Sequence, residues 1–421
     1  MILANGAVYD TAKQQALLDA LPGALTRTLS GPPLPQGTVV EALDRAASLL
    51  EAGAYAELLP DVQLQGAVSL AARMLHREAV TYRLQTELPP LDAQVLPEGF
   101  TPHRRVYRPL GVLLHIAAGN MDVLPAYSVM EGLLTGNINL LKLPQADTGL
   151  TIRFFEAFLE LAPELRDYIY VFDTPSTDLP AMQHLISVSD GIAVWGSDAA
   201  VSAVRQLAPP GCRLIEWGHK LGFCYISGYE DRTLELSQLA AHIAATQQLL
   251  CSSCQVIYLD TQDMVEVYDF CKAFLPVLDA ACAGIRQSPG AAAQSTLRRY
   301  TAFLEHTMAP EREEPSVYRG RCSSLTACED ASLTLSGLYG NCLVKRLPSK
   351  DIVPVLRQTS RYLQTAGLIC EASRRRALTE SLLQSGVTRV MHAGDMSDTY
   401  LGEAHDGEYA LRRYVRICDI S

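Results

Sequence analysis

Residues 111–143, GVLLHIAAGNMDVLPAYSVMEGLLTGNINLLKL, contain the pattern that decides the fold class. A short apolar run at 111–117 is followed by a helical pattern at 123–135 and by a second apolar run at 138–143. Short apolar runs separated by a helix are typical of parallel strands in a β-α-β unit. The stretch therefore predicts a parallel sheet that helices cover on both faces.

The same alternation continues beyond residue 143. The further predicted elements are helix 148–161, strand 169–173, helix 177–188, strand 191–196, helix 198–207 and strand 213–217. We expect an α/β cofactor domain of the Rossmann type over residues 105–222. No G-x-G-x-x-G follows any of these strands, so the usual dinucleotide-binding fingerprint is absent.

Two regions flank this domain. Residues 1–104 are rich in Ala and Leu and are interrupted by Pro, so we expect a helical N-terminal region with arms. A strand near residue 223 and a helix from about Asp231 begin a second α/β domain, which we expect to extend to residue 395. Residues 396–421 form the remaining segment.

Composition excludes several classes of protein. A chain of 421 residues with 48% hydrophobic and 19% charged residues predicts two or three well-packed domains. The net charge of -11, with scattered Lys and Arg, argues against nucleic acid and anionic membranes as partners. No apolar run reaches the roughly 18 residues of a membrane span, and no signal peptide is evident, so we expect a cytoplasmic protein. The eleven Cys, an odd number, indicate reduced thiols.

Cys251 and Cys254 are three residues apart between a helical pattern and a strand-like run. They could be a redox couple, half of a zinc site, or one working thiol beside a bystander. A thioredoxin-like pair opens a helix, and a zinc site needs a second C-x-x-C or a paired His, which the sequence lacks. A single working thiol is therefore favoured, and an oxidative disulfide that silences it stays open as a side effect.

Five ordered motifs resemble the LuxC-type acyl-CoA reductases, a branch of the aldehyde dehydrogenase superfamily. They are RPLGVLLHIAAGNMDVLPAYSVMEGLLTGNINLLKLP (108–144), GSDAAVSAVRQL (196–207), LIEWGHKLGF (214–223), QQLLCSSCQVIYLD (247–260) and AHDGEYALRRYVRI (404–417). The resemblance implies an aldehyde-dehydrogenase-like fold. It also implies an oxidoreductase that reduces an acyl thioester, on coenzyme A or a carrier, to a fatty aldehyde with NADPH or NADH through a cysteine-bound thioester intermediate.

The resemblance also assigns catalytic roles. Cys251 matches the nucleophile, and Asn120 matches the asparagine that stabilises the oxyanion, whose loss typically costs about 10²–10³ in rate. Asn120 could instead form a turn. Glu216 matches a mobile glutamate that would accept a proton, although a structural use is an open alternative, and a structural role is favoured for His219. No metal is implied.

Cofactor residues follow from the same match. Lys142 corresponds to the lysine that binds the adenosine ribose, while Gly196 and Ser197 would approach the pyrophosphate and Ala118 would lie beside the cofactor. Gln145 stands where NAD-preferring relatives have a glutamate. Because a neutral amide does not repel a 2′-phosphate, we expect NADPH to be used at least as well as NADH.

The match has two departures and leaves alternatives. Gly337 replaces the glutamate that binds the nicotinamide ribose in the superfamily, and Val201 replaces a glycine near the pyrophosphate. The superfamily implies that residues 396–421 close the cofactor domain and support a homo-oligomer, a dimer or tetramer, and an acyl-transferring partner protein is a further candidate. Aldehyde oxidation and a non-catalytic scaffold are the alternative functions. Acyl chain length is not set by the sequence.

Overall fold

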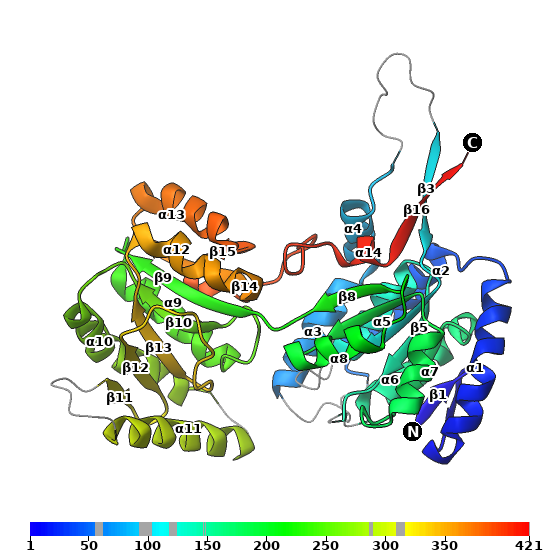
Figure 1. Cartoon of the computed structure of the whole chain (residues 1–421), viewed down its shortest axis with the longest axis horizontal. Helices are drawn as coiled ribbons and strands as arrows, with labels where there is room; N and C mark the ends of the chain where they lie inside the picture. The colour runs from blue at the N-terminus through cyan, green and yellow to red at the C-terminus, as the bar shows by residue number, and fades with distance from the viewer. Residues whose placement is uncertain are drawn as a thin grey trace. The chain divides into compact units, whose positions relative to one another are not determined.

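The computed structural model describes residues 1–54, 62–91, 103–117, 124–145, 147, 149–285, 289–308 and 316–420. The chain forms two compact units (Figure 1). The first contains Met1–Gly218 together with Tyr400–Ser421, and the second contains His219–Thr399. The four-part division drawn from the sequence stays a prediction.

A seven-stranded sheet is the centre of the first unit, in the order β2-β1-β6-β5-β4-β7-β8. Its strands are β1 (Ile2–Ala4), β2 (Ala7–Tyr9), β4 (Val112–Ile116), β5 (Ile138–Lys142), β6 (Ile169–Phe172), β7 (Gly191–Trp195) and β8 (Arg213–Trp217). The intervening helices are α5 (Leu124–Leu134), α6 (Leu150–Leu161), α7 (Leu179–Ser187) and α8 (Asp198–Leu207). Strands β4 to β8 pair with one another in parallel, so the predicted Rossmann-type alternation is confirmed.

Both faces of this sheet are buried, which explains why its strands are continuously apolar. Leu141 packs into a core with helices α5 and α6, whereas its neighbour Leu140 packs into a core on the opposite face with helices α1 and α7. The N-terminal helices are α1 (Gln14–Leu29), α2 (Gln36–Glu51), α3 (Val62–Leu75) and α4 (Arg77–Glu87). These four helices agree with the helical pattern that the sequence shows in the N-terminal region.

Residues 2–9, at the start of the region predicted to be mostly helical, form two short strands. Strands β1 and β2 form a hairpin whose turn residues Asn5 and Gly6 have φ values of 50° and 74°. Asn-Gly is favoured where both turn residues adopt positive φ. The hairpin adds to the cofactor sheet because β1 pairs with β6.

The strand order sets a switch point between β4 and β7. The chain runs from β4 through β5 to β6 in one direction, then returns to β7 and continues to β8 on the other side. In open α/β sheets, ligands bind outside the carboxyl ends of the strands at such a switch point. The carboxyl ends of β4 and β7 are therefore where this sheet is expected to bind a ligand.

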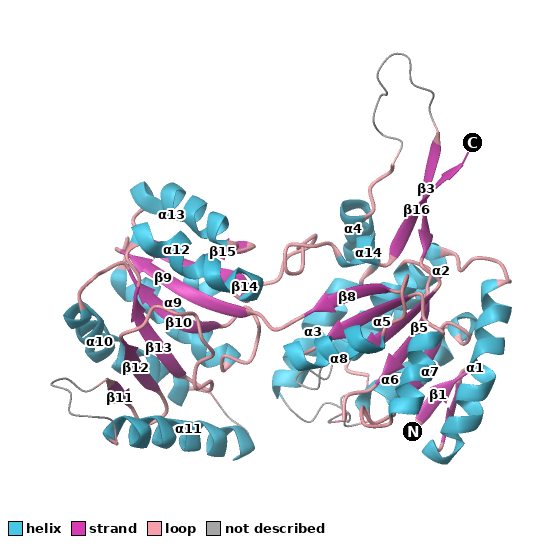
Figure 2. Ribbon diagram, viewed as in Figure 1, coloured by secondary structure: helices cyan, strands magenta, loops and turns pink. Residues whose placement is uncertain are grey.

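The second unit contains another seven-stranded sheet, in the order β11-β12-β13-β10-β9-β14-β15 (Figure 2). Its strands are β9 (Leu221–Ser227), β10 (Cys254–Leu259), β11 (Val317–Arg319), β12 (Ser324–Cys328), β13 (Asn341–Arg346), β14 (Leu363–Cys370) and β15 (Arg389–Met391). Helices α9 (Arg232–Thr246) and α10 (Met264–Ala283) cover one face, and α12 (Ile352–Leu356) and α13 (Ala372–Ser385) cover the other. Helix α11 (Pro289–Thr307) also belongs to this unit.

The C-terminal segment returns to the first unit. Helix α14 (Ala410–Arg413) leads into β16 (Val415–Ile420), which pairs with β3 (Arg104–Pro109) as an antiparallel ribbon. The C-terminal segment thus contains a strand, which pairs with β3 and does not join the seven-stranded sheet. Short 3₁₀ helices complete the chain at η1 (Thr11–Lys13), η3 (Pro163–Leu165), η4 (Ser349–Asp351), η5 (Arg357–Tyr362) and η6 (Ala393–Asp395).

Candidate active site

Cys251 lies in a turn between α9 and β10, at the amino-terminal edge of the second sheet. Helix α9 ends when Gln247 and Gln248 adopt positive φ values of 49° and 62°, which reverses the chain toward the strand. Side chains other than Gly adopt this conformation at a cost, so surrounding contacts must hold it. The Cys251 side chain is exposed.

The contacts that hold this turn come from two glutamines. The Gln248 amide nitrogen donates to the Cys254 carbonyl oxygen at 2.8 Å, and its amide oxygen accepts from the Gly340 N–H at 3.0 Å. Gln255 donates to the Gln248 carbonyl at 2.8 Å and accepts from the Ser336 hydroxyl at 2.7 Å. These buried bonds fix the loop, here called the cysteine loop (residues 247–254), on the sheet.

Gly222 in β9 supports the same loop by having no side chain. A Cβ atom there would lie 2.7 Å from the carbonyl oxygens of both Ser252 and Ser253. Backbone atoms at that distance cannot move aside without displacing the loop. The glycine in the GHKLGF segment thus permits the close approach of the cysteine loop to β9.

The two cysteines of the pair have different environments. Cys254 is 0% exposed at the start of β10, and burial raises the pKa of its thiol to about 12. Its sulfur lies 3.5 Å from the Val256 carbonyl oxygen, to which the thiol donates. A thiol of high pKa in an apolar core is inert, whereas Cys251 is accessible and its sulfur accepts a hydrogen bond from the Gln364 amide.

The segment GLYGN (337–341) has a structural use in this protein. A Cβ at Gly337 would lie 2.8 Å from the Asn341 Cβ, so the turn leaves no room for the glutamate found in the superfamily. The Tyr339 N–H donates to the Gln247 carbonyl at 2.9 Å. Together with the Gly340 bond, this contact makes the segment a support for the cysteine loop.

Lys142 ends β5 at the carboxyl edge of the first sheet. Lys142 is 3% exposed, and its Nζ donates to the Ser176 hydroxyl at 2.8 Å. Burial lowers the pKa of the Lys142 amine, and the negative charge of Asp173 partly offsets this effect. Asp173 directly follows the adjacent strand β6, and the sequence interpretation overlooked it. Gln145 is exposed three residues beyond Lys142.

Gly196 and Ser197 connect β7 to α8 at the same edge. The Ser197 hydroxyl caps the helix by accepting from the Ala200 N–H at 3.4 Å. A Cβ at Gly196 would lie 3.2 Å from the Ala200 Cβ, so the strand enters the helix at close range. The N–H groups of a helix N-terminus suit a phosphate, and this one lies beside the switch point.

Glu216 on β8 is bound by an arginine that the sequence interpretation did not consider. Both carboxylate oxygens accept from the Arg205 guanidinium on α8, with 2.5 Å between Nη2 and Oε2. As a proton acceptor, Glu216 would have to leave this pair. His219 packs against the Tyr362 ring at 6.4 Å between centroids, which agrees with a structural role.

An aromatic cluster lies at the carboxyl ends of β7 and β8. Trp195 and Trp217 stack at 5.3 Å between ring centroids, and His405 approaches them at 5.2 Å and 5.0 Å. His405 comes from the AHDGEY segment, where Asp406 and Gly407 make a turn with φ values of 51° and 83°. Both tryptophans of the chain are in this cluster, which periodicity could not reveal.

The predicted site residues fall into two groups and a remainder. Lys142, Gln145, Gly196, Ser197 and Glu216 lie at the carboxyl edge of the first sheet, within one unit. Cys251 lies in the second unit. Asn120, predicted to stabilise the oxyanion, and Ala118, predicted to lie beside the cofactor, are outside the described residues.

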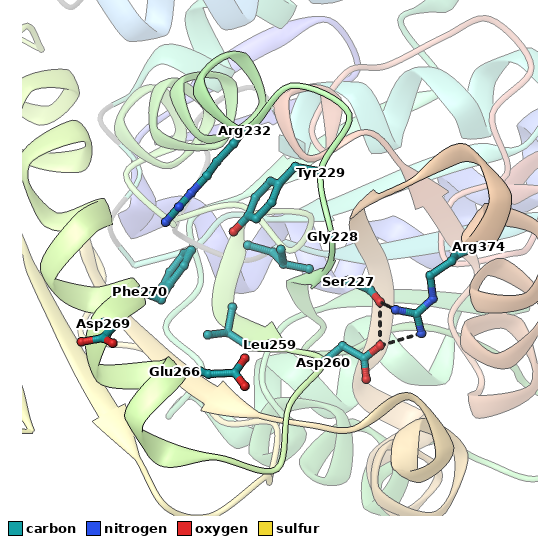
Figure 3. A pocket seen from close by; sticks show the side chains of 11 residues that line it. Ser227, Gly228, Tyr229, Arg232, Leu259, Asp260, Glu266, Asp269, Phe270 and Arg374 are labelled. Atoms are coloured by element: carbon teal, nitrogen blue, oxygen red, sulfur yellow. Dashed lines mark hydrogen bonds and ion pairs between the residues drawn. The ribbon is translucent and has the colours of Figure 1, made fainter.

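A cavity of about 340 Å³ lies elsewhere in the second unit (Figure 3). Ser227, Asp260 and Arg374 line it at the carboxyl ends of β9 and β10, and Arg374 donates to Asp260 at 2.8 Å. Cys251 precedes the other end of β10, and a strand of this length spans roughly 20 Å. The cavity is therefore separate from Cys251.

In the described part of the chain, no group of three or more His, Cys, Asp or Glu side chains is arranged to hold a metal ion. Nor does any described helix have the length and apolarity required to cross a membrane.

Comparison with protein families gives a match over most of the chain. A family model described as acyl-CoA reductase (LuxC) matches residues 35–417. Long-chain acyl-protein thioester reductase 2 of Photobacterium leiognathi is 22% identical over 316 residues, covering 73% of this chain and 63% of the relative. The long-chain acyl-protein thioester reductase of Aliivibrio fischeri is 22% identical over 322 residues, covering 73% and 64%. The chain thus spans less than two thirds of these relatives.

Solved structures show the same fold. An NADP-dependent glyceraldehyde-3-phosphate dehydrogenase from Bacillus halodurans, complexed with NADP, has a TM-score of 0.72 at 16% identity, covering 100% of this chain and 99% of that one. A NAD-dependent benzaldehyde dehydrogenase from Corynebacterium glutamicum has a TM-score of 0.65 at 17% identity, covering 98% and 91%. The predicted aldehyde-dehydrogenase-like α/β fold is confirmed.

Proposed function

Because the chain belongs to the acyl-CoA reductase (LuxC) family, we propose that it reduces an acyl thioester to the aldehyde with NADPH or NADH. The observation that carries this proposal is the environment of Cys251. Its thiol is exposed on a loop fixed by buried hydrogen bonds, while Cys254 beside it is buried with a pKa of about 12. One accessible sulfur on a rigid support is what acyl transfer to a cysteine requires.

In the proposed first step, the Cys251 thiolate attacks the carbonyl carbon of the thioester. The new C–S bond forms, the bond to the donor sulfur breaks, and the donor leaves as a thiolate that takes up a proton. Asn120 is the proposed side-chain donor to the carbonyl oxygen as it becomes negative. The product is an acyl group on Cys251.

For the second step, Lys142 and the amino terminus of α8 would hold a nicotinamide dinucleotide, whose chemistry would be the transfer of a hydride to the acyl carbon. Cys251 then leaves: the carbonyl forms, the C–S bond breaks, and the electron pair returns to its sulfur. This reduction needs no activated water, so the pairing of Glu216 with Arg205 is compatible with it. Oxidation of an aldehyde to an acid would need such a water.

The residues of the first sheet fit a nicotinamide dinucleotide. Lys142 presents an amine at the end of β5, and Gly196 and Ser197 open α8 beside the switch point. The Lys142 amine would hold the adenosine ribose, and the α8 N-terminus would face the pyrophosphate. Gln145 leaves a 2′-phosphate unrepelled, which favours NADPH.

We further infer the setting of the enzyme. The relatives named above act on acyl-protein thioesters, so a protein-bound long-chain acyl group is a candidate donor alongside acyl-CoA. The composition fits a cytoplasmic protein, and the β3–β16 ribbon is a candidate contact of a homo-oligomer.

The test is incubation of the purified protein with a panel of acyl-CoA and acyl-carrier thioesters without nicotinamide, followed by peptide mass spectrometry. We expect an acyl adduct on the peptide that contains Cys251, and aldehyde release when NADPH is added. No adduct with any thioester, from a folded protein, would overturn the proposal.

A further inference from the structure

We propose that Gln364 is a donor to the nucleophile, holding the sulfur of Cys251 and stabilising its thiolate form. This inference rests on the proposed function only in taking Cys251 as the nucleophile. The Gln364 Nε2 lies 3.3 Å from the Cys251 Sγ, within hydrogen-bonding distance for sulfur. An amide nitrogen of this kind donates and never accepts, so the bond must run toward the sulfur.

The position of Gln364 comes from an irregularity in β14. The register between β14 and β9 shifts between Leu363 and Ala366, so two residues, Gln364 and Thr365, lie at a bulge. Bulges re-aim side chains and are frequent next to active sites. Gln364 is 7% exposed, so little water reaches its side-chain amide. Water therefore competes little for the hydrogen bond between this amide and the Cys251 sulfur.

The Gln364 amide has a hydrogen-bond partner at each of its two polar atoms. Its oxygen accepts from the Thr365 hydroxyl at 3.4 Å, which directs the nitrogen toward Cys251. The Gln364 carbonyl accepts from the Thr388 N–H at 3.1 Å and from the Thr388 hydroxyl at 3.2 Å. These bonds tie the bulge to the adjacent strand β15, so the donor is positioned before substrate arrives.

Charged groups of both signs lie near this edge of the sheet. The partners of the cysteine loop described above, Gly222, Gln255, Ser336 and Gly340, are uncharged. Three cations lie at the amino-terminal edge of the sheet: Lys220 before β9, Arg361 before β14 and Arg389 at the start of β15. The acidic groups of the neighbouring segment are Asp395 in η6 and Asp398 just beyond it.

Lys220 is held at this edge because its Nζ donates to the Arg361 carbonyl at 2.9 Å. A donor hydrogen bond and nearby positive charge both stabilise the charged form of a thiol.

Gln364 would act at two points of the proposed reaction. It raises the population of the attacking thiolate, and it stabilises the same thiolate when the C–S bond breaks.

The test is the pH profile of Cys251 alkylation by iodoacetamide, with the modified peptide quantified by mass spectrometry. This readout needs neither an acyl donor nor a cofactor, so it is independent of whether the protein reduces thioesters. In Gln364→Leu we expect the midpoint to rise by about one pH unit, with about tenfold slower alkylation at pH 7. Gln364→Glu, which adds a negative charge, should raise the midpoint at least as much.

Two variants control the experiment. Gln384→Leu removes an exposed glutamine on α13 that donates to Glu380, and its profile should match the wild type. Thr365→Val keeps Gln364 but removes the group that orients it, so a smaller rise is expected even if Gln364→Leu does not fold. An unchanged midpoint in the folded Gln364→Glu and Thr365→Val proteins would overturn the proposal.

Discussion

The two thiols of the C-x-x-C pair differ in burial, and burial decides their chemistry. Cys254 is part of an apolar core with residues of α9 and α10, whereas Cys251 faces solvent. A buried thiol is deprotonated only at high pH, and thiolates are the reactive species. Spacing alone could not separate the two roles, because both residues lie in the same short motif.

Substitution of each cysteine should give opposite results. Cys251→Ala should abolish acyl-adduct formation, since no other sulfur occupies its position. Cys254→Ala removes a small buried group, so it should lower stability by about 1 kcal/mol and retain most of the adduct. The measurement is adduct yield by mass spectrometry in reducing buffer. Equal loss of adduct in two folded variants would restore a joint role for the pair.

Cofactor choice should depend on the charge around Lys142. Gln145→Glu places a carboxylate three residues from Lys142 and should shift preference toward NADH by roughly 1–2 kcal/mol. Asp173→Asn removes a negative charge near Lys142 that would repel a 2′-phosphate, and it should shift preference toward NADPH. The measurement is the ratio of kcat/KM for the two cofactors. Ratios that stay constant in both variants would show that the 2′ position is recognised by other residues.

Some candidate site residues could be proposed from the sequence and others could not. Cys251, Lys142 and Ser197 stand in motifs with fixed spacing from strand ends, so a resemblance could assign them. Gln364 and Arg205 act through contacts with residues 113 and 11 positions away, respectively. Such contacts depend on strand order and on a bulge, neither of which leaves a local pattern in the sequence.

At the scale of elements, a glycine in β9, Gly222, allows the cysteine loop to pack closely against this strand. Gly222→Ala would bring a Cβ within 2.7 Å of two loop carbonyl oxygens, so the loop must shift. We expect Cys251 alkylation to slow by about tenfold or more, since small displacements of a nucleophile have large effects. The matched control is Gly290→Ala in α11, where a Cβ meets nothing within 4 Å. Unaltered alkylation in Gly222→Ala would contradict this role.

His115 makes β4 sensitive to acid. The ring is buried, its Nδ1 lies 2.7 Å from the Ser128 hydroxyl oxygen, and its Nε2 lies 3.0 Å from the Asn139 amide oxygen. Burial lowers the pKa of His115 from 6.5 to about 4. Above pH 6.5 the ring is neutral in both folded and unfolded chains, so it carries no penalty. Between pH 6.5 and about 4 only the unfolded chain takes up the proton.

Stability should therefore fall as the pH decreases through this window. The loss from His115 alone is at most about 1.4 kcal/mol per pH unit and about 3 kcal/mol in total. Urea unfolding followed by Trp195 and Trp217 fluorescence reports on this unit, because both tryptophans lie in it. His115→Gln should flatten the pH dependence of the unfolding free energy between pH 6.5 and 4. Identical slopes would show that other groups dominate.

The elements themselves were largely predictable. Runs such as 191–196 are apolar because both sheet faces are covered, and periodicity detects that condition directly. The β1–β2 hairpin was missed because its strands have three residues each, too few for a period to show. The Asn5-Gly6 pair was the local signal that could have identified it.

At the scale of the whole molecule, the C-terminal segment completes the first unit. The Leu411 N–H donates to the buried carboxylate of Glu87 at 2.8 Å, and the Asn137 amide donates to the Tyr414 carbonyl at 3.0 Å. Tyr414 itself is fully buried. Strand β16 also pairs with β3 along its whole length. Residues at the two ends of the sequence therefore share one core.

Deletion of residues 401–421 should consequently leave an insoluble protein. It would uncover the Glu87 carboxylate and the Asn137 amide, and a buried polar group without a partner typically costs about 1–3 kcal/mol. It would also remove Leu411 and Tyr414 from the core, at about 2–5 kcal/mol each. The summed loss is comparable with the free energy of unfolding of a typical domain, about 5–15 kcal/mol. Ile417→Ala is the matched control, since this side chain is 55% exposed and its loss should leave the soluble yield unchanged. The measurement is soluble yield and cofactor binding followed by tryptophan fluorescence. A soluble truncated chain that still binds NADPH would show that the first unit folds without its C-terminal strand.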